Sequence, residues 1–335
     1  STVKRVHEAQ RRLLTLWPKL LDSRVLDGRI VDGHGDLRPE HVYLLPKPVV
    51  IDCIEFNSEF RILDVADELS FLAMECENLS ADWVGRQVFQ WYRARSGDQP
   101  DPMLIAFYKC YRACVRAKVA ALRTDQLAGE QRGRATSEAR RYLTLAERYA
   151  RSIGRPLLII VRGRSGTGKS TVATAIAARL GISLLQTDAI RRDLLGESTE
   201  PAGYGQGKYA PELKSMVYRD MFAGAKQLLR AGRSAVLDGT FLAANCRKQA
   251  LEQARRQQAI PLFVECTCPE AVAKQRIAER AKGGETLSEA SAETASYQAI
   301  DEQPDSSRLP GLRLDTTEPL PALLDMVIAA IAAAN

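Results

Sequence analysis

The sequence predicts an α/β fold: a P-loop parallel sheet with flanking helices, preceded by a mainly helical half. Two observations carry this prediction. Positions 156–335 alternate short apolar runs with amphipathic segments, the pattern of a parallel sheet wrapped by helices on both faces. Positions 1–152 are dominated by helical periodicity. We therefore expect two domains, 1–152 and 156–335, joined at residues 152–156.

The composition fits this organisation. The chain has 335 residues, of which 45% are hydrophobic and 26% charged, so it is long enough for about two ordinary globular domains. The net charge of +6 is modest and spread out, which does not favour nucleic-acid binding. Apolar runs are too short for a membrane span, and no secretory signal is visible.

The seven cysteines indicate the compartment. Their number is odd, the chain is too long to need stapling, and their surroundings are apolar, so we expect reduced thiols and a cytoplasmic location. The pairs Cys110/Cys114 and Cys266/Cys268 are expected to pack in the core rather than to bind metal.

Five short apolar runs in the second half predict the strands of the sheet. Helical segments separate each run from the next. Because ligands of such sheets bind at the carboxyl ends of the strands, we expect the functional site at that edge. The predicted strands are 157–161, 183–186, 234–237, 261–265 and 312–314.

A phosphate-binding loop follows the first predicted strand directly. Residues 163–170 form a complete GxxxxGK[ST] (Walker A) motif, and a helical segment, 171–180, comes next. In this order, loop N–H groups and the positive end of the helix surround the phosphates of a nucleotide. We expect ATP, because no NKxD-type guanine signature follows. The residues expected to bind it are Gly163, Arg164, Ser165, Gly166, Thr167, Gly168, Lys169, Ser170 and Thr171.

Four side chains near this loop have the types that phosphoryl transfer requires. We expect Lys169 to contact the β- and γ-phosphate oxygens and the Ser170 hydroxyl to coordinate Mg²⁺. Asp238, at a strand end like a Walker B carboxylate, is expected to hold the water shell of the metal. Asp188, which follows the second strand, would act as base or anchor an acceptor hydroxyl.

Three arginines complete the predicted site. Arg191 lies one helical turn beyond Asp188 and is expected to hold the acceptor. Arg276 and Arg280 share one helix face, and we expect them to close over the phosphates as lid arginines. Simpler interpretations stay open: Asp188 as a helix cap, Asp238 as a turn residue, and the arginine pair as a solvated face.

The motifs of this half resemble those of the small P-loop kinases of the AAA_33 type, a predicted-kinase group related to polynucleotide kinase, chloramphenicol phosphotransferase and zeta toxins. The resemblance covers about residues 156–330. It implies the fold and the use of ATP, but not the acceptor, because members phosphorylate different hydroxyls. The matching segments are GRSGTGKST at 163–171, TDAIRRDLLG at 187–196, YAPELKSMVY at 209–218, VLDGTFL at 236–242 and VECTCPEAVAKQRIAER at 264–280.

The first half carries a second group of candidates. Segments 31–41 and 49–56 place two carboxylates, Asp36 and Asp52, in loops beside short apolar strands. In a kinase-like site, one would orient the acceptor hydroxyl and the other would hold Mg²⁺. A role for both only as hydrogen-bonding anchors of an inactive scaffold stays open.

The segment His34-Gly35-Asp36 and the later Ile-Asp pair resemble the C-terminal lobe of the aminoglycoside phosphotransferase family, whose pattern is roughly HGDxxxxN followed by an ID-containing strand. The resemblance covers about residues 28–150 and implies a catalytic Asp36 and a metal-binding Asp52. His41 stands where the family has an Asn, and an imidazole is a poor ligand for Mg²⁺.

In the aminoglycoside phosphotransferase family, a nucleotide-binding upper lobe precedes the HGD segment. Only 33 residues precede His34, so we expect this lobe to be absent. Either the first half is a truncated relic whose remaining site binds an acceptor or a regulator, or the start of the chain was trimmed. The chain also begins without Met.

Residues 102–123 predict one long amphipathic helix in this half. Its expected apolar stripe is Leu104, Tyr108, Tyr111, Val115, Val119 and Leu122. A basic stripe lies elsewhere on it. We expect a solvated face there, with docking of an anionic ligand or of the second domain as the alternative. The basic residues are Lys109, Arg112, Arg116 and Arg123.

Together these features predict an ATP- and Mg²⁺-dependent kinase that phosphorylates a hydroxyl of a small-molecule acceptor, with catalysis in the second half. The first half would shape acceptor binding or regulate it. Two alternatives stay open: an ATP-binding switch or scaffold, and a polynucleotide 5′-hydroxyl kinase, whose basic groove the mixed charges do not favour. The sequence leaves the acceptor and the oligomeric state open.

Overall fold

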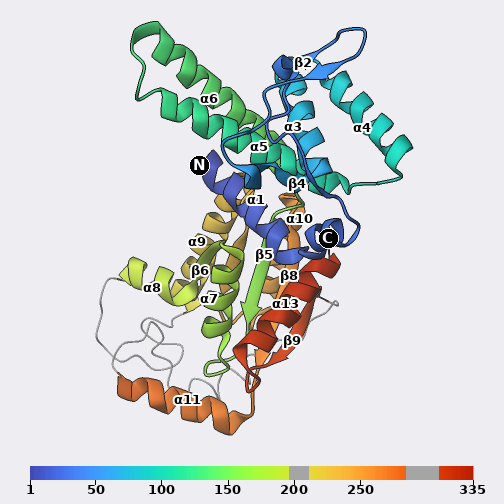
Figure 1. Cartoon of the computed structure of the whole chain (residues 1–335). Coiled ribbons are helices and arrows are strands. Elements are labelled where there is room, and N and C mark those ends of the chain that lie inside the picture. The colour runs from blue at the N-terminus through green and yellow to red at the C-terminus, as the bar shows by residue number, and fades with distance from the viewer. Residues whose placement is uncertain (196–210, 284–308, 335) are drawn as a thin grey trace. The chain divides into compact units, whose positions relative to one another are not determined.

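The chain forms two compact units, Ser1–Gly154 (unit 1) and Arg155–Asn335 (unit 2). The computed structural model describes residues 1–195, 211–283 and 309–334 (Figure 1). Unit 2 has the predicted α/β architecture, whereas unit 1 is mainly helical. Within the described ranges, no helix is long and apolar enough to cross a membrane.

The sheet of unit 2 has five strands, all parallel, in the order β6-β7-β5-β8-β9. This confirms the predicted fold class, and each predicted strand is present with bounds shifted by at most two residues at either end. The central strand is buried because its apolar run is covered on both faces. The bounds are β5 Leu157–Arg162, β6 Ser183–Gln186, β7 Ala235–Asp238, β8 Ile260–Thr267 and β9 Gly311–Asp315.

Helices flank this sheet (Figure 1). On one side, Leu158 and Ile160 of β5 share a core with Tyr218 and Met221. The first helix after β5 is flanked by Gly168 on one side and Gly181 on the other. Both glycines have backbone angles in the left-handed region, which glycine adopts readily. The helices are α7 Lys169–Leu180, α8 Thr187–Leu195, α9 Pro211–Arg230, α10 Ala244–Arg256, α11 Glu270–Gly283 and α13 Leu320–Ala334.

The edge strand β9 lies very close to β8 at Gly311. Gly311 is paired with Phe263, and a Cβ at Gly311 would lie 2.0 Å from the Phe263 carbonyl oxygen. Only a residue without a side chain fits there. From this point β9 runs to Asp315 and leads directly to Thr316, which faces the phosphate loop.

Unit 1 consists of six helices and two short antiparallel ribbons within residues 1–154, all of which are described. Ribbon β1-β4 pairs Ile30–Asp32 with Ile62–Asp64, and ribbon β2-β3 pairs Val42–Tyr43 with Val49–Val50. Two short 3-10 turns, Pro39–His41 and Ser58–Arg61, lie next to the ribbons in sequence. The helices are α1 Thr2–Leu16, α2 Lys19–Leu26, α3 Val65–Asn78, α4 Asp82–Ser96, α5 Pro102–Arg123 and α6 Gly129–Ala150.

Helix α5 has the predicted bounds, but its predicted apolar stripe is only half right. Leu104 and Tyr108 are buried and Val115 is half-buried, whereas the other three residues, Tyr111, Val119 and Leu122, are exposed. The helix instead buries small residues at its centre, such as Ala113, where α6 packs closely against it.

The prediction of a solvated basic face on α5 is wrong for three of its four residues. Lys109 pairs with Glu77 at 2.5 Å, Arg112 with Asp67 at 2.6 Å and Arg116 with Glu75 at 3.0 Å. All three carboxylates lie on α3, which packs beside α5. Of the four, Arg123 is exposed, as predicted.

Candidate active site

The loop between β5 and α7 adopts a conformation that depends on its glycines. Gly163, Gly166 and Gly168 have φ angles of 144°, 84° and 77°, which residues with side chains rarely adopt. Space is also limiting: a Cβ at Gly163 would lie 2.5 Å from the Cys266 carbonyl oxygen, and one at Gly166 would lie 2.6 Å from that of Ala273. The bare backbone of the loop is therefore available for close approach by a ligand.

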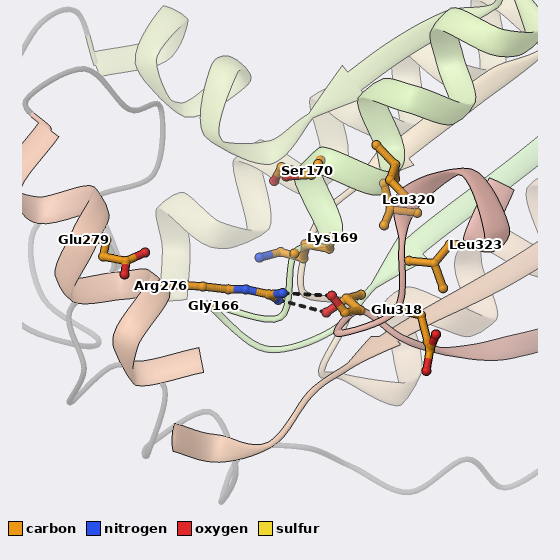
Figure 2. A pocket seen from close by; sticks show the side chains of 12 residues that line it. Gly166, Lys169, Ser170, Arg276, Glu279, Glu318, Leu320 and Leu323 are labelled. Atoms are coloured by element: carbon orange, nitrogen blue, oxygen red, sulfur yellow. Dashed lines mark hydrogen bonds between the residues drawn. The ribbon is translucent and has the colours of Figure 1, made fainter. Parts of the chain in front are cut away.

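A cavity of about 570 Å³ opens beside this loop. Its size is in the range of small-molecule sites. Gly168, Lys169 and Ser170 line one side, while Arg276 and the apolar Leu323 line others. Lys169 and Arg276 both line this cavity (Figure 2), so two cationic groups from distant parts of the sequence face the same space.

Arg276 reaches the cavity from α11. Its Nη1 donates to Thr316 Oγ1 at 2.9 Å and its Nη2 to the Thr316 carbonyl oxygen at 2.8 Å (Figure 2). The Arg276 guanidinium is therefore hydrogen-bonded to Thr316 beside the loop. The expectation of a lid arginine did not include this contact. The backbone of Arg280 lies on the same helix, but its side chain is outside the described residues.

Asp238 ends β7, the strand beside β5, as its sequence position predicted. It is buried, and one carboxylate oxygen accepts a 3.0 Å hydrogen bond from Gln186 Nε2. The other oxygen is buried and has no hydrogen-bond partner in the described part of the chain. A buried oxygen of this kind fits a bound water or metal ligand, and Mg²⁺ prefers oxygen donors. Asp238 and the Ser170 hydroxyl are thus suitable groups for a hydrated Mg²⁺.

Asp188 lies inside the first turn of α8 rather than before the helix, because α8 begins at Thr187. Arg191 Nη1 donates to Asp188 Oδ1 at 2.5 Å, so this carboxylate and this guanidinium form one paired group. Both side chains are partly buried. A helix-capping carboxylate would precede the helix and accept from its backbone amides, whereas Asp188 lies within the helix and accepts from Arg191.

Two buried side chains at this edge of the sheet were not singled out from the sequence as site residues. The Tyr218 hydroxyl accepts a 2.9 Å hydrogen bond from the Phe241 amide, and burial raises the Tyr218 pKa to about 12. Burial also raises the pKa of the Cys266 thiol to about 12, against the opposing effect of Lys169. Cys266 is buried, as expected, and Cys268 is partly buried; all seven cysteines are free.

The segment of the sequence that contains this site is similar to known proteins. Residues 158–301 match the model of the AAA domain family. The match includes the phosphate loop, Asp188, Asp238 and Arg276. Together with the parallel sheet, it shows that unit 2 is a kinase-like P-loop domain.

Relatives of the whole chain are longer. An uncharacterized protein of Mycobacterium tuberculosis is 36% identical over 304 residues, which cover 90% of this chain and 59% of that protein. The chain thus spans about three-fifths of the length of the curated relatives it matches first. A 2-phosphoglycerate kinase of Pyrococcus horikoshii is 38% identical over 92 residues, 27% of this chain and 26% of that protein.

Among solved structures, the APS kinase CysC of Mycobacterium tuberculosis, in complex with AMPPNP and APS, is similar in fold. It is 20% identical with a TM-score of 0.40, and the likeness covers 53% of this chain and 98% of that one.

The unit 1 candidates lie outside the AAA domain match and gather around His41. His41 Nε2 lies 3.3 Å from Asp52 Oδ2, and its Nδ1 is 3.0 Å from the main-chain oxygen of Asp36. Arg38 Nε donates to the Asp36 carboxylate at 3.0 Å. The Asp52 side chain is 75% exposed.

This arrangement does not fit the magnesium site that the sequence suggested. An arginine and an imidazole already face the two carboxylates. Within residues 1–195, 211–283 and 309–334, no group of three or more His, Cys, Asp and Glu residues is placed to hold a metal ion. We therefore derive no metal-dependent step in unit 1.

Two side chains that the sequence did not single out for this loop hold its backbone. Glu68 accepts hydrogen bonds from the amides of His34 at 2.7 Å and Gly35 at 3.0 Å, and a longer one from Leu37. Arg112 donates to the Gly35 carbonyl oxygen at 3.1 Å. These contacts favour a structural role for the loop.

Proposed function

We propose that unit 2 is an ATP-dependent kinase that transfers the γ-phosphoryl group to a hydroxyl of a small-molecule acceptor. The observation that carries the proposal is the meeting of the phosphate loop, Lys169 and Arg276 at one cavity. Phosphoryl transfer depends mainly on positioning and on cations that stabilise developing charge, and this arrangement supplies both. The similarity of part of the chain to 2-phosphoglycerate kinases of two Pyrococcus species supports the same conclusion.

Each side chain has a distinct role in the proposed reaction. The loop amides hold the phosphates, and Lys169 and Arg276 face the negative charge on the transferring group. Mg²⁺, held by Ser170 and through water by Asp238, would supply further charge neutralisation at the phosphates when bound.

The acceptor is assigned to the group formed by Asp188 and Arg191. Asp188 would orient the acceptor hydroxyl and accept its proton, and Arg191 would hold the acceptor and keep the carboxylate in place through their ion pair. The apolar wall at Leu320 and Leu323 offers a surface for the nucleoside.

For unit 1 we propose a relationship to the C-terminal lobe of the aminoglycoside phosphotransferase family, with domains at 1–152 and 156–335. The HGD segment and the positions of Asp36 and Asp52 support it. We assign unit 1 a role in acceptor binding or regulation, because the phosphate loop and the residues that line the cavity beside it belong to unit 2. The seven free thiols support a reducing compartment such as the cytoplasm.

A screen for ADP formation tests the proposed function. Hydroxyl compounds, including the 2-phosphoglycerate named for the archaeal relative, are offered with ATP and Mg²⁺ to the native chain and to Lys169→Ala. We expect turnover with one compound class and its loss in the variant by a factor of about a hundred or more, since removing one preorganised charge-stabilising group costs several kcal/mol.

Two outcomes would contradict the proposal. Unchanged ATP binding and turnover in Lys169→Ala would remove the phosphate loop from the mechanism. Tight ATP binding without ADP formation from any class of hydroxyl compound would instead indicate a nucleotide-dependent switch.

A further inference from the structure

Thr316 joins the phosphate loop to helix α11. Its hydroxyl lies 2.9 Å from the Thr167 carbonyl oxygen, to which it donates, and accepts from Arg276 Nη1 at 2.9 Å. Its carbonyl oxygen accepts from Arg276 Nη2 at 2.8 Å, and its amide donates to the Thr267 carbonyl oxygen at 2.8 Å. The residue is buried, so each of these polar contacts replaces water.

These contacts hold the Arg276 guanidinium against the backbone of the phosphate loop. A Cβ at Gly168 would lie 3.3 Å from Arg276 Nη1 and 3.3 Å from Thr316 Oγ1. Gly168 precedes Lys169 directly. The guanidinium thus lies next to the peptide that positions the loop lysine.

We propose that Thr316 is a positioning residue of the nucleotide site: its two hydrogen bonds hold Arg276 beside the phosphate loop. This inference rests on the proposed function of the loop as an ATP site. A free arginine side chain has many rotamers, and fixing it only on binding lowers affinity. The paired hydrogen bonds to Thr316 remove that cost in advance.

The threonine that follows supplies a matched control. The Thr317 hydroxyl donates to Asp315 Oδ1 at 2.7 Å and is exposed, so Thr317→Val removes a hydroxyl one residue away without touching the Arg276–Thr316 contacts. Titration calorimetry with ATP and Mg²⁺ then compares native chain, Thr316→Val, Thr316→Ser and Thr317→Val. We expect Thr316→Val to weaken ATP binding about tenfold to a hundredfold, the usual effect of losing a hydrogen bond to a charged group. Thr316→Ser and Thr317→Val should bind like the native chain.

A double-mutant cycle separates positioning from a general structural role. If Thr316 acts through Arg276, then Thr316→Val has no further effect on ATP affinity in an Arg276→Ala background. An equal loss in both backgrounds, or a Thr316→Val protein that binds as tightly as Thr317→Val, would overturn the inference while leaving the ATP site intact. If the valine variant does not fold, Thr316→Ala, which also removes the hydroxyl, takes its place in the same cycle. A native chain that does not bind ATP would overturn both this inference and the proposed function.

Discussion

Gln186 donates a 3.0 Å hydrogen bond to one carboxylate oxygen of Asp238 and leaves the other oxygen buried without a hydrogen-bond partner in the described part of the chain. The two residues are paired at the ends of neighbouring strands β6 and β7. A buried acceptor without a partner costs about 1–3 kcal/mol, so folding alone gives no reason to keep it. A bound water or a metal-bound water would satisfy this oxygen.

We expect Asp238→Asn to weaken ATP binding roughly tenfold with Mg²⁺ and very little with EDTA, because the amide keeps the shape but loses the charge that holds the hydrated metal. Calorimetry under both conditions measures the difference. Asp220→Asn, on the partly exposed Asp220 of α9, is the control. Equal weakening with and without Mg²⁺ would show that Asp238 does not act through the metal.

Once an acceptor is known, the Asp188–Arg191 pair can be divided into its two roles. Asp188→Asn should lower kcat by a factor of about 10²–10⁴, the usual range for a lost general base, with little change in ATP affinity. Arg191→Gln should mainly raise the acceptor KM. Steady-state kinetics separates these effects, and full turnover in Asp188→Asn would remove this residue from the chemistry.

The Arg112–Asp67 ion pair predicts a stability effect in unit 1. Both side chains are 11% exposed, so Arg112→Met leaves a buried carboxylate uncompensated and should cost about 3–5 kcal/mol of unfolding free energy. The double variant Arg112→Met/Asp67→Leu should recover part of this loss. Urea unfolding measures both, with Arg123→Met on the same helix as a control expected within about 0.5 kcal/mol of native. Equal stability of the Arg112 and Arg123 variants would refute the prediction.

The raised pKa of Cys266 predicts its reactivity. Burial raises the pKa of this thiol to about 12, so it is neutral at pH 8, and native protein at this pH should label at Cys266 with iodoacetamide far more slowly than urea-unfolded protein. The raised pKa also sets how stability depends on pH. The stabilisation from the buried neutral thiol is fully present below pH 9, the ordinary pKa of a thiol, and is lost as the pH rises toward 12. Mass spectrometry after timed labelling measures the rates. Rapid labelling of the native chain would show that the site is open.

The parallel sheet was predictable because its signal is local. Each strand is a short apolar run that stays buried wherever its neighbours lie, and a GxxxxGK[ST] loop between a strand and a helix has one common geometry. The expectation that Lys169, Ser170 and Arg276 share one site agrees with their position around one cavity. Their chemical roles, like those of Asp36 and Asp52, stay predictions.

The parts that could not be predicted depend on partners far away in the sequence. Thr316 meets Arg276 across 40 positions, and nothing in either segment signals the contact. The basic face of α5 was misjudged for the same reason: helical periodicity shows which residues share a face but not that α3 brings Asp67, Glu75 and Glu77 against it.

Gly311 indirectly determines where Arg276 lies in the wall of the cavity beside the phosphate loop. The strand that carries Thr316 can lie against β8 only while position 311 has no side chain. A methyl group there would displace β9 and, with it, the anchor of Arg276, although Gly311 is not among the residues that line the cavity. Attempts to redesign substrate preference in this domain should therefore leave that glycine untouched, even though a survey of ligand contacts would never mark it.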